Sequence, residues 1–146
     1  MIPKFRGLSV ELNDEQNWKY GYLIEDGKES FIINQVIEAN EQYITIGSWY
    51  PARPETVSQS TGLFDDLGNE LFEGDIILWT YWDEFKDEGV AKIVFDKGMF
   101  KLLDLITGEE VWNSLFDCIE NCNVYLNGNV YESQELLKEK WWVTIC

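Results

Sequence analysis

Short runs of β-branched and aromatic residues, separated by polar segments that favour turns, dominate this chain. In its first third the runs cover residues 18–24, 30–37 and 42–49, and Asp26-Gly27 stands between the first two. An Asp-Gly pair can adopt the positive φ angles of a tight hairpin. Runs of this length and composition are typical of strands rather than of helices. The pattern predicts an antiparallel β-meander over residues 1–55.

The second half repeats this pattern after an interruption at two prolines. Pro51 and Pro54 each lack a backbone N–H and restrict the residue before them, so they favour a boundary near residue 55. Further strand-like runs follow, with turn signals such as Gly74-Asp75 and Thr107-Gly108 between them: 76–82, 90–95, 100–105 and 110–116. Four or five short strands in this order predict a small SH3-like β-barrel.

The C-terminal region predicts one short helix and an apolar tail. Ser133 is suited to cap the N-terminus of a helix over residues 134–140. Residues 141–146 are too apolar to hang free in water, so we expect them to dock on their own core or on a neighbour. The expected fold class is mainly β, or β-rich α+β, in two domains. These are a meander subdomain at 1–55 and an SH3-like barrel with a C-terminal helix and tail at 56–146.

Charge and histidine content exclude several functional classes. The chain has 27 acidic and 11 basic residues, a formal charge of −16 and no histidine. Without histidine it lacks the usual general base near neutral pH and the commonest metal ligand, which excludes His-based triads and zinc proteases. Nucleic-acid binding needs a positive footprint, and the few basic residues are scattered. We expect no direct nucleic-acid partner and no cofactor.

The cysteines and the lack of long apolar stretches bear on location. Cys118, Cys122 and Cys146 form neither an even disulfide framework nor a paired CxxC zinc motif, and an odd count fits a reducing compartment. The N-terminus carries no apolar signal region, and no stretch approaches the roughly 18 apolar residues that span a bilayer. We expect a cytoplasmic protein without a membrane partner, in which Cys118 and Cys122 are buried or half-buried thiols.

Four blocks of sequence form a long and specific set of motifs that extends over most of the chain. They are KFR at 4–6, TVSQSTGL at 56–63, DLGNELFEGDI at 66–76 and GNVYESQELL at 128–137. Together these blocks resemble the YopX-like family of phage and prophage proteins. The resemblance implies a β-rich fold, an oligomeric habit and the cytoplasm of a bacterial host. It implies no assigned biochemical role, so no catalytic residue is carried over.

The second and third blocks and the two residues between them, 56–76, which we call the central block, contain a cluster of acidic side chains. Five carboxylates lie within eleven residues: Asp65, Asp66, Glu70, Glu73 and Asp75. Hard cations such as Mg²⁺ prefer several oxygen ligands, so the alternative function is a divalent-metal-dependent enzyme that uses this carboxylate cluster, centred on Glu73 and Asp75. Alternate residues of a hairpin point to opposite faces, however, so the five carboxylates cannot all converge. We therefore predict no catalytic residue and no metal site.

The same block has a structural interpretation. Asp66 and Asn69 would hydrogen-bond to the backbone of a turn. Three glycines would supply unusual torsion angles, and three apolar residues would point inward: Gly62, Gly68 and Gly74, and Leu63, Leu71 and Ile76. On this interpretation the block is a signature of the fold rather than of a reaction.

Acidic and aromatic residues are both frequent over residues 65–88. This window holds nine acidic residues and one basic residue, Lys86, and therefore carries −8, half the charge of the chain. An anionic surface with aromatic anchors suits a host protein with a basic surface, since charge steers the encounter and buried rings supply the binding energy. An ordinary solvated acidic face is the alternative. The candidate partner-binding residues are Trp79, Trp82, Asp83, Glu84, Phe85, Asp87 and Glu88.

Adjacent aromatic residues occur at Trp49-Tyr50 and Trp141-Trp142. Flat rings can stack on sugars or bases. Because neighbouring strand residues face opposite sides, one ring of each pair can instead fill a core while the other covers a second subunit. We predict oligomer contacts at Trp49, Trp141 and Trp142. The predicted function is that of a non-enzymatic phage or prophage accessory protein that forms a homo-oligomer and binds a host or phage protein.

Overall fold

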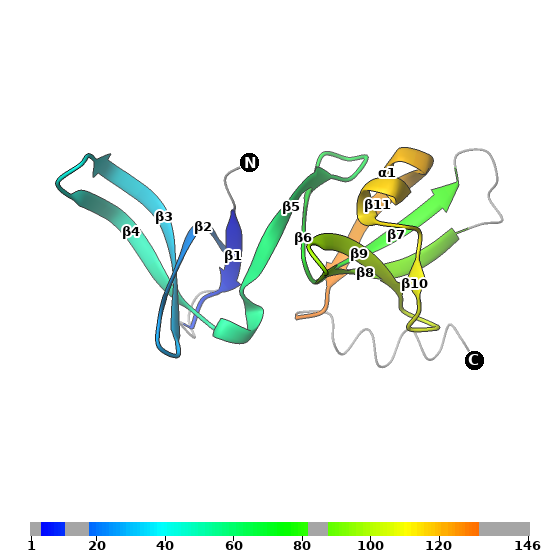
Figure 1. Cartoon of the computed structure of the whole chain (residues 1–146), viewed down its shortest axis with the longest axis horizontal. Coiled ribbons are helices and arrows are strands. Elements are labelled where there is room, and N and C mark those ends of the chain that lie inside the picture. The colour runs from blue at the N-terminus through cyan, green and yellow to red at the C-terminus, as the bar shows by residue number, and fades with distance from the viewer. Residues whose placement is uncertain (1–3, 11–17, 82–87, 132–146) are drawn as a thin grey trace. The chain divides into compact units, whose positions relative to one another are not determined.

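The computed structural model describes residues 4–10, 18–81 and 88–131 of the chain (Figure 1). The chain forms two compact units, Met1–Ser60 and Thr61–Cys146. Both units are built from antiparallel strands, with one short α-helix in the described residues. The predicted mainly β class is confirmed. None of the helices in the described part of the chain is long and apolar enough to cross a membrane.

The first unit is the predicted meander with one additional strand. Its main strands are β2 (Trp18–Asp26), β3 (Glu29–Ala39) and β4 (Ile44–Ala52), which pair in chain order. Gly27 has a φ of 63° in the two-residue loop between β2 and β3, so the hairpin predicted at this point is confirmed. Polar Asn40 accepts hydrogen bonds from two backbone N–H groups in the next turn. The residues of these turns therefore determine where one strand of the meander ends and the next begins.

The sequence did not reveal strand β1 (Phe5–Leu8), which is only four residues long and contains Arg6 and Gly7. It pairs with β2 on one side and with β5 (Ser58–Phe64) on the other. Arg6 is buried because its Nε donates to Ser58 Oγ at 3.1 Å and its guanidinium stacks 4.3 Å from the centre of the Trp18 ring. The short 3₁₀ helix η1 (Pro54–Thr56) leads from β4 into β5. The KFR block therefore has a structural role.

The second unit contains an open five-stranded sheet. Its strands are β7 (Asp75–Tyr81), β8 (Glu88–Asp96), β9 (Met99–Asp104), β10 (Glu110–Val111) and β11 (Cys122–Asn129), in the spatial order β10-β9-β8-β7-β11. β5 ends in this unit and is followed by β6 (Glu70–Phe72). The buried core is apolar: Leu71, Ile77, Ala91, Ile93, Leu102, Leu115, Cys118, Cys122 and Val124.

The prediction of an SH3-like barrel is wrong. β10 and β11 lie at opposite edges of the sheet, and no ladder joins them within the described residues. The run expected as a strand at 110–116 stops at Val111 because Trp112 adopts a φ of 60°, and helix α1 (Leu115–Asn121) follows. Ser114 Oγ caps this helix by accepting from the Asp117 N–H at 3.0 Å. Leu115 and Cys118 then fill the core in place of a closing strand. The helix predicted at 134–140 and the tail at 141–146 lie outside the described residues.

Candidate protein-binding surface

Side chains of β2, β3 and β4 form aligned rows on one face of the first unit. Tyr22 pairs with Ile33, which pairs with Trp49 on the next strand. Directly paired residues place their side chains on the same face of a sheet. In the neighbouring row Ile24 pairs with Phe31. The strand register therefore assembles a continuous apolar surface from residues far apart in the sequence.

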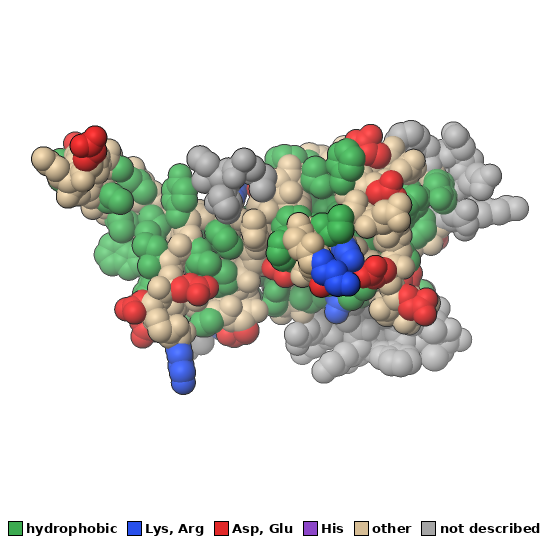
Figure 2. Space-filling model, viewed as in Figure 1, with side chains coloured by type: hydrophobic (Ala, Val, Ile, Leu, Met, Phe, Trp, Pro, Cys, Tyr) green, Lys and Arg blue, Asp and Glu red, His purple; other side chains and the backbone are tan. Residues whose placement is uncertain are grey.

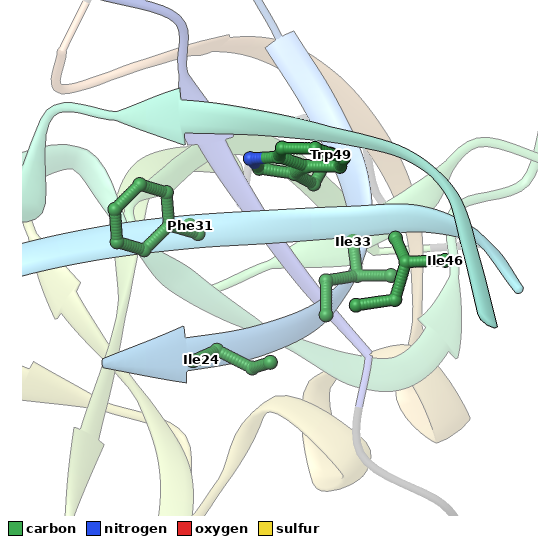
Figure 3. Close-up of a pocket in the computed structure, with 5 residues that line it drawn as sticks. All are labelled: Ile24, Phe31, Ile33, Ile46 and Trp49. Carbon is green, nitrogen blue, oxygen red and sulfur yellow. The ribbon is translucent and has the colours of Figure 1, made fainter. Parts of the chain in front are cut away.

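This surface is open to solvent and hollowed. Tyr22, Ile24 and Trp49 are 54%, 46% and 55% exposed. Next to them lies a groove of about 260 Å³ lined by Ile24, Phe31, Ile33, Ile46 and Trp49 (Figure 3). Figure 2 shows hydrophobic side chains gathered over β3 and β4. We call this surface, made of Tyr22, Ile24, Phe31, Ile33, Ile46 and Trp49, the apolar face.

An apolar surface of this kind is typical of a binding site for another macromolecule, because single exposed apolar residues are common but contiguous ones are not. Of the three predicted oligomer contacts, Trp49 lies exposed on the apolar face. Trp141 and Trp142 lie outside the described residues. Sequence reasoning missed the other residues of the apolar face. The alternation over residues 18–24 together with the Asp26-Gly27 hairpin was the signal that could have paired Ile24 with Phe31.

The predicted partner-binding residues are described only in part. Trp82, Asp83, Glu84, Phe85 and Asp87 lie outside the described residues, and Glu88 is exposed at the start of β8. Trp79 is half-buried and packs against the core of the second unit. Its ring makes edge contacts with Trp112 at 5.4 Å and Tyr81 at 6.2 Å. A Cβ at Gly89 would come within 2.6 Å of this indole. The described contacts of Trp79 are therefore contacts of packing.

Three of the five clustered carboxylates, those of Asp65, Asp66 and Asp75, accept hydrogen bonds from backbone N–H groups. Asp65 is 6% exposed and accepts from the N–H groups of Leu67, Asn69 and Leu126 at 2.7 to 3.0 Å, and from Asn69 Nδ2 at 3.0 Å. Burial raises the pKa of Asp65, but the hydrogen bonds to its charged form lower the pKa by more, so it lies below the ordinary value. Asp65, rather than the predicted Asp66, is the acceptor that organises this turn.

Asp75 has a similar structural role at the start of β7. It is 1% exposed, and its Oδ2 accepts from the Phe72 N–H at 2.7 Å. The glycines behave as predicted, with positive φ angles at Gly62, Gly68 and Gly74. Leu71 and Ile76 are buried, and Leu63 packs against the core. Among the described residues, no group of three or more Cys, Asp or Glu side chains is placed to hold a metal ion.

Cys118 and Cys122 are buried in the core, which confirms the expectation of buried thiols. Burial raises the pKa of both thiols above the ordinary value. A thiol must lose its proton to act as a nucleophile or to bind a metal. The structure therefore gives these two cysteines a packing role.

Taken together, these features define a mainly β protein of two antiparallel sheets, with structural carboxylates and an exposed apolar face. The chain belongs to the YopX protein family, since residues 4–138 match the model of that family. The crystal structure of protein EF1440 from Enterococcus faecalis is similar, with a TM-score of 0.62 and 24% identity over 94% of this chain and 99% of that chain. Protein yopX from Bacillus subtilis matches with a TM-score of 0.47 and 16% identity, over 92% and 95% of the two chains. No curated protein matches the sequence.

Proposed function

We propose that this chain is a non-enzymatic accessory protein of a phage or prophage, and that it self-associates through the apolar face. The observation that carries the proposal is the exposure of Tyr22, Ile24 and Trp49 around a groove of about 260 Å³. Burying one large apolar side chain contributes about 1.5–3 kcal/mol, so a contact that covers this surface can hold two proteins together. The phage or prophage origin is supported by membership of the YopX protein family.

The charge of the chain also favours a contact of this kind. Two copies that each carry −16 repel one another, but salt screens this repulsion beyond about 8 Å at physiological ionic strength. Contacts between copies are then most favourable where both surfaces are apolar and lack charge. The six side chains of the apolar face are all uncharged.

The alternative, a divalent-metal-dependent enzyme using the carboxylate cluster, has weaker support. The oxygens of Asp65 and Asp75 already accept backbone N–H groups, including those of Leu126 and Phe72. A cation would have to compete with these bonds, and breaking them would leave buried N–H groups unsatisfied. The bonds of Asp65 and Asp75 therefore favour a structural role for these two carboxylates.

Replacing Tyr22 and Trp49 together by serine tests the proposed self-association. We expect the dissociation constant of the oligomer to rise at least about ten-fold, since ten-fold corresponds to only about 1.4 kcal/mol of lost apolar contact. Folding should survive because both side chains are more than half exposed. Sedimentation equilibrium measures the change. Phe64→Ser with Leu67→Ser is the matched control, since these residues are 52% and 75% exposed in the second unit. Equal dissociation constants for the two double variants would contradict the proposal.

We also propose that the acidic window at 65–88 binds a host protein with a basic surface. Asp65 and Asp75 of this window are buried, so support comes from its seven other acidic residues, of which Glu88 is exposed. Two oppositely charged surfaces attract at long range, so binding should be strongest at low salt. This contact is distinct from the proposed self-association.

Charge reversal tests the proposed host contact. The test variant carries lysine in place of each of four acidic residues: Asp83, Glu84, Asp87 and Glu88. Tagged chain with these changes should no longer capture the host protein, and mass spectrometry of the captured material measures this. The control reverses four exposed acids of the first unit and changes the net charge equally: Glu25, Asp26, Glu29 and Glu38. Capture that persists in the first variant, or is lost equally in both, would show that residues 83–88 are not the contact.

A further inference from the structure

The sheet of the second unit carries apolar side chains on both of its faces. One face holds Ile77 and Leu102 and packs against Leu115 of helix α1. Successive residues of a strand point to opposite faces, so Ile76 and Leu78 lie on the other face, which we call the outer face. Directly paired residues share a face. The outer face is therefore made of Ile76, Leu78, Val90, Leu103 and Tyr125, with Lys92 between Ile76 and Leu103.

The composition and burial of the outer face favour a second layer of side chains over it. A sheet face that meets water usually carries polar residues in alternation with the apolar ones of the core face. β7 departs from this alternation, because residues 76–79 are all apolar. Continuous apolar runs are typical of strands that are covered on both faces. Ile76 is only 1% exposed, and Leu78, Val90, Leu103 and Tyr125 are half-buried.

The last described residues of the second unit lie beside the outer face. β11 ends at Asn129, and the Val130 N–H donates to Gly74 O at 2.9 Å, two residues before Ile76. The Tyr131 ring lies against Gly74, since a Cβ added there would be 2.7 Å from the Tyr131 Cε2 atom. Residues 132–146 follow directly from this point, next to the end of β7 at which Ile76 lies.

The segment that follows has the length and the side chains to form such a layer. A helix over 134–140, as predicted from the sequence, is about 10 Å long at 1.5 Å per residue. β7 and β9 are separated by two strand spacings, which also amount to about 10 Å. Leu136 and Leu137 supply adjacent apolar side chains, and Glu135 and Lys138 fall on the opposite side of such a helix.

We propose that residues 134–140 form a helix that packs through Leu136 and Leu137 on the outer face of the same copy of the chain. Isolated helices shorter than about 12–15 residues are marginal in water, so this helix depends on the contact. Only Glu132 and Ser133 link it to Tyr131, and a short link gives an effective concentration of about millimolar at the outer face. The short link favours the same copy over a second one. The proposal does not depend on the proposed self-association.

Methyl NMR of the full chain tests the contact directly. With labelled leucine and valine methyl groups, we expect nuclear Overhauser cross-peaks from Leu136 or Leu137 to at least one of Leu78, Val90 and Leu103. Absence of these cross-peaks would overturn the proposal. A mixture of labelled and unlabelled copies identifies their source. Cross-peaks that join two different copies would show that the segment docks on a neighbour instead, which would also overturn it.

Hydrogen exchange tests whether the helix depends on the contact. The amides of residues 138–140 should be protected in the unmodified chain and should exchange at least about ten-fold faster in Leu136→Gln with Leu137→Gln. Glutamine has nearly the helix propensity of leucine, so the loss reports the contact. Glu135→Gln with Lys138→Gln is the control, because both double variants keep the charge of −16. Equal exchange in the two variants, or unprotected amides in the unmodified chain, would contradict the proposed docking.

Discussion

Replacing Gly21 by alanine is expected to destabilise the chain by about 3 kcal/mol or more. A Cβ at Gly21 would lie 2.0 Å from the carbonyl oxygen of Ile33 and 3.1 Å from the Asn34 Cα. These are backbone atoms of the paired strand β3, so they cannot move aside without breaking the ladder between β2 and β3. Gly21 also has a φ of 153°, which side chains rarely permit. Overpacking and backbone strain of this kind each cost about 1–3 kcal/mol.

Urea unfolding of the Gly21→Ala chain measures this loss. Gly27→Ala is the matched control, because Gly27 has a φ of 63° but no atom within 4 Å of an added Cβ. Its cost should be only the conformational one, about 1–2 kcal/mol. If the free energy of unfolding fell by the same amount in both variants, the close approach of β3 to Gly21 would not contribute to the loss of stability. A lost β2–β3 ladder would also weaken self-association, because it would dismantle the apolar face.

Replacing Asp65 by alanine is the second change expected to have a large effect, about 3 kcal/mol at neutral pH. It removes the acceptor of three backbone N–H groups and of Asn69 Nδ2. Each hydrogen bond to a charged group contributes about 1.5–3 kcal/mol, and water can replace only some of them. Asp66→Ala is the control, since Asp66 accepts one long bond from the Val124 N–H at 3.4 Å. Similar free energies of unfolding for the two variants would contradict the role assigned to Asp65.

The pH dependence of unfolding follows from the lowered pKa of Asp65. Burial raises this pKa, and the hydrogen bonds of the side chain lower it by more. The charged form of Asp65 is therefore favoured more in the folded chain than in the unfolded chain. In the unfolded chain the pKa of an Asp carboxyl is about 4. The stabilisation is present above pH 4 and is lost as the pH falls through the folded pKa. Unfolding curves of the unmodified and Asp65→Ala chains should therefore converge in acid and diverge at neutral pH.

The features that the sequence predicted well are those that depend on neighbouring residues. The hairpin at Gly27 and the turn glycines of the central block follow from local torsion preferences, and both are present. Strand β1 was missed because a buried Arg6 resembles a surface residue until Ser58 and Trp18 are known to surround it. Helix α1 was missed because residues 110–116 have strand composition. Its Ser114-x-x-Asp117 cap was the available signal.

The apolar face could be predicted only at Trp49. Its other members gather through the pairing of three strands, and a shift of one residue would have turned them to the opposite face of the sheet. The register between β3 and β4 also changes at Gln35 and Val36. Alternation alone could not have located these shifts. The partner-binding residues predicted at 82–87 remain a prediction from charge and aromatic content.

The most direct test of self-association is sedimentation equilibrium of the unmodified chain, from low-micromolar to submillimolar concentration, at low and at high salt. The average mass should rise above the 17.1 kDa of one chain as the concentration increases. High salt should maintain or strengthen the association, because it screens the repulsion between acidic copies and leaves apolar contacts intact. A mass of 17.1 kDa at every concentration and at both salt levels would contradict the proposed function.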